Sequence, residues 1–336
     1  MARILVTGGA GYVGGVCASR LIAQGHQVVV VDDLSTGNAA AVPLGITLHI
    51  VDIGDRFAIR QIFASGKFDA IFHFAAKALI PESVTNPGYF FESNVASSIL
   101  LLEEARVAGI KKFVFSSSAA VYGNPMSAPI GEDEPTSPVN SYGETKLMLE
   151  RVLKWYANAY DWSVTAFRYF NACGGTPLIG EDHRPETHII PLLLQVAADE
   201  REYFEIFGRD YPTADGTCLR DYVHVLDIAD AHILALQAMD RPGMFIYNIG
   251  TGKSLSVQEI CHVVEGIVGK KLRTKDSARR PGDPAILQAS PDLIMSHLGW
   301  IPRHSDIEYI VRSAWEWKRK NPDGYGRESA IPSSRL

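Results

Sequence analysis

Tyr142 and Lys146, in the segment SYGETK, are the residues of this sequence whose types and spacing most directly suggest chemistry. A phenol and an ammonium four residues apart on a helix lie on one face, one turn from each other. The positive charge stabilises the phenolate, so a tyrosine with a free pKa of about 10 can act as a base near neutrality. Alone the spacing is a weak signal, because it also occurs on ordinary solvated helix faces.

A glycine-rich run, TGGAGYVGG, spans Thr7–Gly15. Gly8, Gly11 and Gly14 recur every third residue, and a start at Gly9 also satisfies the pattern GxGxxG. Glycine is required where the turn is tight and where a side chain would keep a pyrophosphate from the helix N-terminus. A purely structural turn is the alternative, but a strand pattern precedes the run and a helical pattern follows it. A tyrosine base beside a dinucleotide predicts hydride transfer on an alcohol.

Polar residues end three of the predicted strands. Asp32 can accept hydrogen bonds from the adenosine ribose and would repel the extra phosphate of NADP, so NAD is favoured. Its neighbour Asp33 fits equally a solvated strand end, and Asp52 suits either the adenine edge or a helix cap. Ser116–Ser118 follow a strand, at the sheet edge where ligands bind, and a hydroxyl there can share the substrate proton with Tyr142.

The composition is that of an ordinary globular protein with one large or two ordinary domains in 336 residues. A net charge of −6 argues against a nucleic-acid or anionic-membrane partner. No apolar run is long enough to cross a bilayer, and no signal peptide precedes the first strand. The four cysteines are scattered and form no CxxC pair, as expected for reduced thiols. We therefore expect a cytoplasmic protein.

Strands alternate with helices through residues 1–171, which predicts a Rossmann-type α/β domain with a doubly wound parallel sheet. The expected strands are Arg3–Thr7, QVVVVDD, ITLHIVDI, FDAIFHFAA, KKFVFSSS and SVTAFRYFN, and the expected helices are Gly14–Gln24, Arg56–Ser65, Pro87–Ala108 and Ser141–Tyr160.

Residues 172–336 are expected to form a smaller α/β substrate domain, with a segment of about 220–249 returning to the first domain. Its first part, 172–188, is rich in Gly, Pro and charge, as in a long functional loop, and a helix is expected over Ile189–Asp199. Two short strands are expected in 204–224. Asp227 is the expected N-cap of a helix ending at Met239, and Ser256 with Glu259 predicts a capping box for a helix ending at Val268.

Other catalytic motifs are absent or incomplete. GTGKS at Gly250–Ser254 lacks the P-loop glycine, which is replaced by Tyr247, and neither GxSxG nor HExxH occurs. His183 and His188 lie near acidic residues and could be metal ligands. We expect histidines of a flexible loop instead, and no metal site.

The motifs TGGAGYVG, DDLSTGN, HFAA, SSSAAVYG, SYGETK, RYFNACG, IFGRDYPTADGTCLRDYVHV and RRPGD run from the first strand to about Pro322. With them the chain resembles the extended short-chain dehydrogenase/reductase family, and within it the nucleotide-sugar 4-epimerases. The resemblance implies interconversion of UDP-galactose and UDP-glucose by transient oxidation at sugar carbon 4, with tightly bound NAD as cofactor. It also implies a homodimer formed through Pro87–Ala108 and Ser141–Tyr160.

The resemblance implies that Tyr142 is the base, that Lys146 binds the nicotinamide ribose and lowers the Tyr142 pKa, and that Ser118 aids proton transfer. It places the cofactor on Gly8, Gly11, Tyr12, Val13, Gly14, Asp32, Asp33, Leu34, Ser35, Asp52, Ile53, Phe74, Ala75, Ala76, Asn94, Tyr142, Lys146 and Tyr169. It places the UDP-sugar on Ser118, Tyr142, Asn171, His188, Ile189, Phe207, Arg220, Arg280, Asp283 and Leu287.

In this resemblance Asn171, Arg220 and Arg280 hold the diphosphate, Phe207 lies near the uracil and Asp283 on its ribose. Two arginines suit a diphosphate in an acidic protein, although Arg220 could instead form an ion pair with a neighbouring acid. Leu287 stands where the family sets the size of the sugar.

Two further ambiguities remain at the level of sequence. Lys77 directly follows HFAA, whereas some family members carry a lysine one position later, where Ala78 stands, so Lys77 receives no role. Ser116 and Ser117 compete with Ser118.

Sister enzymes remain open: a pentose, uronate or N-acetylhexosamine 4-epimerase, a UDP-glucuronate decarboxylase, or a 4,6-dehydratase. A dehydratase is disfavoured because Ala119 and Ala120 stand where it would want an Asp-Glu pair. A non-catalytic NAD-sensing module would be expected to lose Tyr142 or Lys146.

Overall fold

The computed structural model describes residues 1–280 and 282–326. Pro281 of the RRPGD motif and residues 327–336 of the second predicted domain lie outside the described residues. No helix of the described part is long and apolar enough to span a bilayer.

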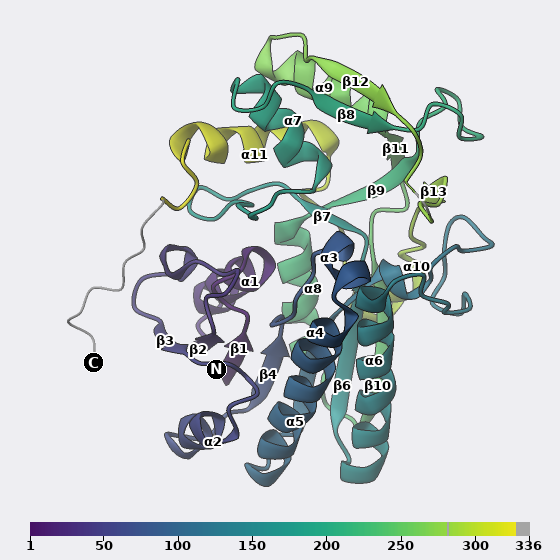
Figure 1. Cartoon of the computed structure of the whole chain (residues 1–336). Coiled ribbons are helices and arrows are strands. Elements are labelled where there is room, and N and C mark those ends of the chain that lie inside the picture. The colour runs from purple at the N-terminus through teal and green to yellow at the C-terminus, as the bar shows by residue number, and fades with distance from the viewer. Residues whose placement is uncertain (281, 327–336) are drawn as a thin grey trace.

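A parallel sheet of seven strands forms the larger unit, in the order β10-β6-β5-β4-β1-β2-β3 (Figure 1). The chain order reverses between β1 and β4, which is the point where ligands bind in doubly wound sheets. Valine-rich runs such as β2 are buried on both faces, as parallel strands require. The strands are β1 Arg3–Thr7, β2 Gln27–Asp32, β3 Thr47–Ile50, β4 Ala70–His73, β5 Lys112–Ser118, β6 Ser163–Tyr169 and β10 Gly243–Ile249. The predicted fold class is confirmed.

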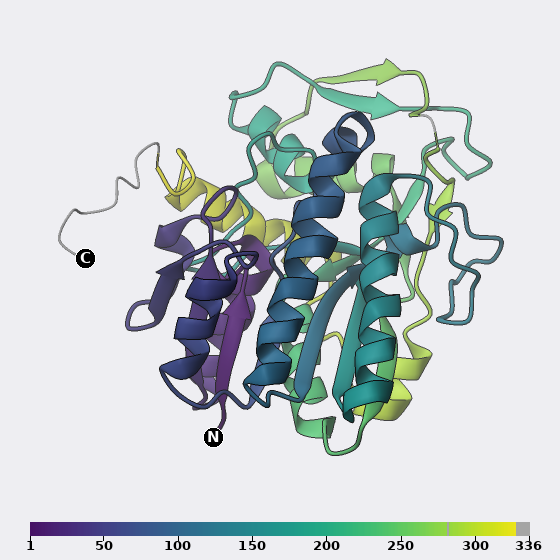
Figure 2. The same cartoon turned by 60° about the horizontal axis from the view of Figure 1, so that its bottom comes forward.

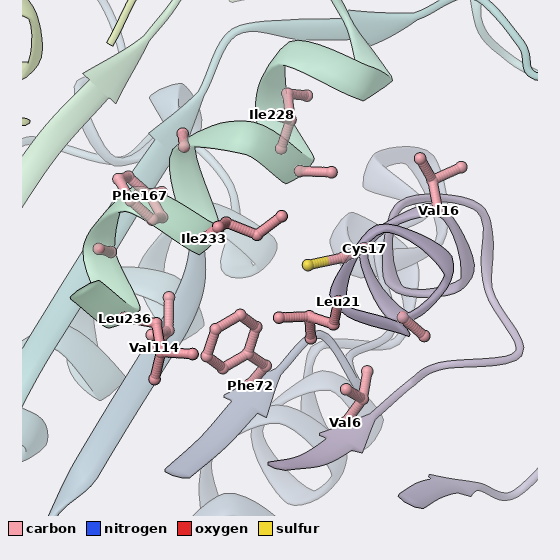
Figure 3. Close-up of a cluster of buried hydrophobic side chains, with 14 of the residues drawn as sticks. Val6, Val16, Cys17, Leu21, Phe72, Val114, Phe167, Ile228, Ile233 and Leu236 are labelled. Atoms are coloured by element: carbon pink, nitrogen blue, oxygen red, sulfur yellow. The ribbon is translucent and has the colours of Figure 1, made fainter. Parts of the chain in front are cut away.

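Helices cover both faces of this sheet. One face carries α2, α5 and α6, of which α5 and α6 stand in front of the sheet in Figure 2. On the other face α1 and α8 pack against each other, and Figure 3 shows Cys17 and Leu21 of α1 with Ile233 of α8 around Phe72 of β4. The helices are α1 Tyr12–Ala23, α2 Arg56–Ala64, α3 Ile80–Thr85, α4 Pro87–Phe91, α5 Ser97–Val107, α6 Ser141–Tyr160 and α8 Val225–Ala238.

A smaller unit lies above the large sheet in Figure 1 and has its own apolar core. Its strand β9 pairs with β7, β11 and β13, while β8 pairs with β12. The strands are β7 Asn171–Cys173, β8 Phe204–Phe207, β9 Leu219–His224, β11 Ser254–Ser256, β12 Thr274–Ser277 and β13 Ile286–Leu287; the helices are α7 Ile189–Ala197, α9 Val257–Val268 and α11 Ile307–Lys320. After β6 the chain enters the smaller unit and returns to the large sheet with α8 and β10. It returns again with α10 Asp292–Leu298, which packs against both of them.

Two local predictions differ in outcome. The capping box of Ser256 and Glu259 is present at the start of α9. Asp227 is not the N-cap of α8, because the helix begins two residues earlier, after His224, whose ring accepts the Leu226 N–H. The Asp227 carboxylate instead accepts hydrogen bonds from the backbone N–H groups of Arg303 and His304, and so ties α8 to the segment that precedes α11.

Candidate functional site

The glycine-rich loop forms a cradle that side chains would fill. Gly8 has φ +71°, and a Cβ there would lie 2.5 Å from the backbone nitrogen of Ala75. A Cβ on Gly14 would collide with the Gly8 carbonyl oxygen, and Gly11 is the N-cap of α1. Backbone N–H groups at a helix start, free of side chains, suit a pyrophosphate. The residues present therefore fit a dinucleotide.

Asp32, at the end of β2, is buried beside this loop. Its carboxylate accepts the N–H of Ala10 at 2.9 Å and that of Leu34 at 2.9 Å. Burial raises the pKa of Asp32, and the two N–H groups act against that rise. The side chain is thus held in place at the edge where β1 and β2 end.

Asp33 and Lys77 form a contact that the sequence interpretation missed. Lys77 Nζ lies 3.4 Å from Asp33 Oδ2 and also contacts the Ser35 hydroxyl. Burial acts to raise the pKa of Asp33, but hydrogen bonds from Ser35 and the charge of Lys77 prevail and lower it. Because β4 and β2 flank β1, the residues that follow these two strands can meet. The order of the strands in the sheet cannot be determined from one sequence, so this contact could not be predicted.

The other predicted cofactor residues gather around the same sheet edge. Asn94 exchanges hydrogen bonds with the backbone of Lys77 and donates to Thr145 Oγ1 on α6. Phe74, directly after β4, stacks on His232 at 4.9 Å between ring centroids, and the Tyr169 hydroxyl lies 2.8 Å from His232 Nε2. Val13, Ile53, Ala75 and Ala76 lie in the turns that follow β1, β3 and β4 or in the first turn of α1.

Asp52 does not cap a helix. Its carboxylate accepts the Gly54 N–H at 2.7 Å, whereas Asp55 is the N-cap of α2. The structure therefore excludes the helix cap as the role of Asp52, and contact with the adenine edge stays a prediction.

Tyr142 and Lys146 lie on one face of α6, with Lys146 Nζ 5.7 Å from the centre of the Tyr142 ring. Lys146 Nζ donates a hydrogen bond of 2.8 Å to the Ser116 carbonyl oxygen. Burial raises the pKa of Tyr142, and the hydrogen bond with Ser118 opposes that rise. Desolvation of the phenolate is thus the largest effect on the Tyr142 pKa, and the expectation that Lys146 lowers this pKa stays a prediction. Burial also lowers the pKa of Lys146 to about 7, against the charge of Glu150.

The structure separates the three serines at the end of β5. Successive strand residues face opposite sides of a sheet, so Ser116 and Ser118 share one face and Ser117 has the other. Ser117 Oγ donates to the buried Glu150 carboxylate at 2.6 Å. Ser116 hydrogen-bonds with Tyr169, and Ser118 with Tyr142. Ser118 is therefore the serine placed to share a proton with the phenol.

Four of the predicted substrate residues meet in the smaller unit. The Arg220 guanidinium forms an ion pair with the Asp283 carboxylate. The Arg280 guanidinium lies 3.9 Å from the centre of the Phe207 ring, and the Asp283 N–H donates to the Arg280 carbonyl. Arg220 thus forms the ion pair that the sequence analysis gave as an alternative to diphosphate binding. Its partner Asp283 is itself a predicted substrate residue.

Leu287 and Asn171 lie where the two units meet. Leu287 pairs with Arg220 in the β13–β9 ladder and packs on the junction cluster, whose buried members are Ala119, Val121, Tyr122, Ile130, Leu147, Phe170 and Ala289. Because Ala119 follows Ser118 and Leu147 follows Lys146, Leu287 lies near the catalytic candidates. Asn171 Nδ2 donates to the Asp221 carbonyl at 3.1 Å.

His188 and Ile189 stand at the start of α7, and His188 is held by buried carboxylates. Its Nδ1 lies 2.8 Å from Glu181 Oε1 and 3.0 Å from Glu186 Oε1, while His183 Nδ1 lies 3.2 Å from Glu181 Oε1. Burial acts to raise the pKa of Glu181, but the two imidazoles lower it to about 2. The expectation of two histidines in a flexible loop does not describe this arrangement.

Comparisons with known proteins show the family of this chain. The sequence profile described as the NAD dependent epimerase/dehydratase family matches residues 4–250. The chain belongs to this family. The UDP-glucose 4-epimerase of Lacticaseibacillus casei, a relative, is 45% identical over 326 residues, which are 96% of this chain and 98% of that protein.

Solved structures give the same picture. A UDP-glucose 4-epimerase superposes with a TM-score of 0.94 at 42% identity, covering 97% of this chain and 100% of that one. The UDP-glucose 4-epimerase of Bifidobacterium longum in complex with NAD+ and UDP superposes with a TM-score of 0.91 at 33% identity, covering 96% and 99%. The resemblance stated from the sequence motifs is therefore confirmed.

Proposed function

We propose that this chain is a UDP-glucose 4-epimerase that interconverts UDP-galactose and UDP-glucose by transient oxidation at carbon 4 of the sugar. The observation that carries the proposal is that Tyr142, Lys146 and Ser118 lie together at the sheet edge that also holds the glycine cradle. Full-length similarity to UDP-glucose 4-epimerases, one of them solved with NAD+ and UDP, supports it.

NAD, when bound, supplies a reversible hydride acceptor for carbon 4. The glycine loop and Asp32 are the residues that would hold its pyrophosphate and adenosine ribose. Asp32 adds negative charge where NADP would carry its extra phosphate, so the site favours NAD. Residues of the protein transfer the proton and hold the UDP part of the substrate.

Tyr142 takes the proton of the sugar 4-hydroxyl. The Ser118 hydroxyl hydrogen-bonds with the groups that exchange this proton. Burial raises the Tyr142 pKa and so disfavours the phenolate, which is the form that accepts a proton. The Ser118 hydroxyl acts in the opposite direction and stabilises the phenolate. In the reverse step Tyr142 returns the proton to the other epimer. General acid–base catalysis of this kind contributes about 100- to 10,000-fold in rate.

The UDP part of the substrate remains anchored while the sugar turns. Arg220 and Arg280 offer charge-assisted hydrogen bonds to the diphosphate, and Phe207 offers an aromatic face to the uracil. An anchored diphosphate lets the 4-keto sugar rotate about its link and present its other face to the same base. This explains why one tyrosine serves both directions.

The larger unit, residues 1–171 together with α8 and β10, is the proposed cofactor domain, and the smaller unit holds the nucleotide sugar. A homodimer through the helices within 87–108 and 141–160 is part of the proposal, as is a cytoplasmic location. The four cysteines are all free and buried, which supports a reducing compartment.

The test is to denature the purified protein, identify the released cofactor, and assay the intact protein with a panel of UDP-sugars. We expect NAD to be retained through purification and UDP-galactose to be converted to UDP-glucose without added cofactor. An epimerase regenerates its cofactor in each cycle, whereas a dehydrogenase must exchange it. Loss of cofactor on purification with net NADH formation would indicate a dehydrogenase. Retained NAD without conversion of any UDP-sugar would indicate a binding module.

A further inference from the structure

Four side chains at the start of the smaller unit bring potential metal ligands together. Glu181, His183, Glu186 and His188 each offer one ligand atom, and all four atoms lie within 4.8 Å of one another. His188 Nδ1 lies 2.8 Å and 3.0 Å from Oε1 of Glu181 and of Glu186. His183 Nδ1 lies 3.2 Å from Glu181 Oε1 and 3.8 Å from Glu186 Oε2. These four residues form the Glu/His cluster.

The spacing of these atoms matches that of ligands around one small ion. Zinc binds imidazole nitrogen and carboxylate oxygen at about 2.0–2.2 Å in a tetrahedron, which sets ligand atoms about 3.3 Å apart. The four nitrogen–oxygen separations, from 2.8 to 3.8 Å with either oxygen of Glu186, lie around that value. Small side-chain adjustments would therefore place an ion at the centre of the cluster.

The two buried carboxylates of the Glu/His cluster can be neutralised by the two imidazoles or by a metal ion. The side chains of Glu181 and Glu186 are only 6% and 4% exposed. Within residues 1–280 and 282–326, the groups that form ion pairs with them are the two imidazoles. Burying two carboxylates is costly unless each is paired with a cation or binds a metal. A divalent ion neutralises both carboxylates and leaves both imidazoles neutral.

A cavity beside the cluster supplies an independent observation. It has a volume of about 40 Å³ and is lined by Glu181, His183, Glu186 and Trp317, among others. Trp317 is 4% exposed, and its Nε1–H has no hydrogen-bond partner among the described residues. An unpaired N–H donor on a residue that lines a polar cavity indicates an acceptor there, such as a bound water.

We propose that Glu181, His183, Glu186 and His188 bind one Zn²⁺, and that the cavity holds a water that accepts the Trp317 Nε1–H. Its role is structural. The Tyr12 ring packs edge-on against His183 at 6.4 Å, and the Tyr12 hydroxyl donates to the Gly174 carbonyl at 2.6 Å. The ion thereby joins the start of α7 to the cofactor loop. This revises the expectation, drawn from sequence alone, that the chain has no metal site.

The test measures metal content of the tag-free holoenzyme. The protein is treated with a chelator, dialysed against Zn²⁺ in micromolar amounts, and analysed by mass spectrometry for bound zinc. We expect one Zn²⁺ per chain in the wild type and background levels in Glu181→Gln and in the double variant His183→Ala with His188→Ala. The matched control is the double variant His49→Ala with His262→Ala, two histidines outside the cluster, which should keep one Zn²⁺ and the Zn²⁺-dependent rise in thermal midpoint.

Absorption spectroscopy of Co²⁺-loaded wild type keeps the test decisive if a cluster variant fails to fold. We expect the intense visible bands of a tetrahedral site with nitrogen and oxygen ligands. Substoichiometric zinc in the wild type, equal zinc in the control and cluster variants, or the weak spectrum of hydrated Co²⁺ would overturn the proposal. None of these readouts depends on epimerase turnover, so failure of one proposal leaves the other standing.

Discussion

Burial and hydrogen bonding have opposite effects on Tyr142, the proposed catalytic base. The phenol of Tyr142 is desolvated, which raises its pKa, while Ser118 stabilises the ionised form. The Lys146 Nζ donates to the Ser116 carbonyl oxygen. Burial lowers the pKa of Lys146 to about 7. The base strength at this site is thus set mainly by burial and by the Ser118 hydroxyl.

We expect Tyr142→Phe to lower kcat by about 100- to 10,000-fold while UDP-sugar binding is nearly unchanged, because only the proton-transfer group is removed. Turnover and calorimetric binding of UDP-glucose measure the two effects. Tyr156→Phe is a matched control on the same helix, since its hydroxyl bonds to Glu103 and not to the catalytic serine. A loss of less than tenfold in Tyr142→Phe would contradict its assignment as the base.

Leu287 is the residue from which we predict sugar selectivity. Leucine is shorter than tyrosine, so we expect UDP-glucose and UDP-galactose to be preferred and N-acetylated sugars to be accepted at a lower rate. Leu287→Tyr should selectively suppress the N-acetyl substrates, since crowding of one small group is worth about 1–3 kcal/mol. The measurement is the ratio of kcat/KM for the two classes, with Leu287→Met as a volume-conserving control. An unchanged ratio would mean that Leu287 does not face the sugar.

Helix α8 carries a buried histidine that couples it to the cofactor edge. His232 Nδ1 lies 2.9 Å from the Ile228 carbonyl, so this nitrogen carries the proton, and Nε2 accepts from the Tyr169 hydroxyl. Burial lowers the pKa of His232 to about 4, with the Ile228 hydrogen bond acting in the opposite direction. The neutral ring is therefore the form that the folded helix accommodates.

From this we predict acid sensitivity. The unfolded chain gains a proton on this histidine below pH 6.5 and the folded protein gains it only near pH 4. Stability is therefore fully present above pH 6.5 and falls as the pH drops toward 4. Protonation of His232 in the unfolded chain lowers the free energy of unfolding by about 2 kcal/mol at pH 5, relative to its value well above pH 6.5. His232→Gln should lose less stability between pH 7 and 5 than the wild type in urea denaturation, whereas exposed His262→Gln should lose as much.

At the scale of the whole molecule, exposed aromatic and apolar side chains mark the surface of α4, α5 and α6. Trp155 on α6 is 74% exposed, and Tyr89 and Val107 are exposed on the neighbouring helices. Large apolar side chains on adjacent helices favour contact with a second copy. This is the same pair of helical segments that the family resemblance assigns to a homodimer.

We expect the chain to have about twice its 36.8 kDa mass in solution and Trp155→Glu to shift it toward the monomer, because a charge in the interface would be desolvated. Light scattering coupled to size exclusion gives the mass. Leu44→Glu is the control, since Leu44 is fully exposed on the loop before β3. A monomeric wild type, or equal masses for wild type and Trp155→Glu, would remove these helices as the interface.

The sequence alone determined the features that depend on short spacings. The glycine cradle, the Tyr142–Lys146 face of α6, the capping box of α9 and the strand–helix alternation all follow from residues within one or two turns of each other. Local periodicity and backbone requirements govern them, so no distant contact was needed to predict them.

The tertiary structure decided what depends on distant partners and on burial. Strand order brought Lys77 to Asp33, strand alternation selected Ser118 from three serines, and the loop before α7 brought Glu181 to His188. Spacing shows that Lys146 is near Tyr142, but only the fold shows that burial raises the pKa of Tyr142. Contacts between residues far apart in the chain, and the water that they exclude, exist only once the fold has formed.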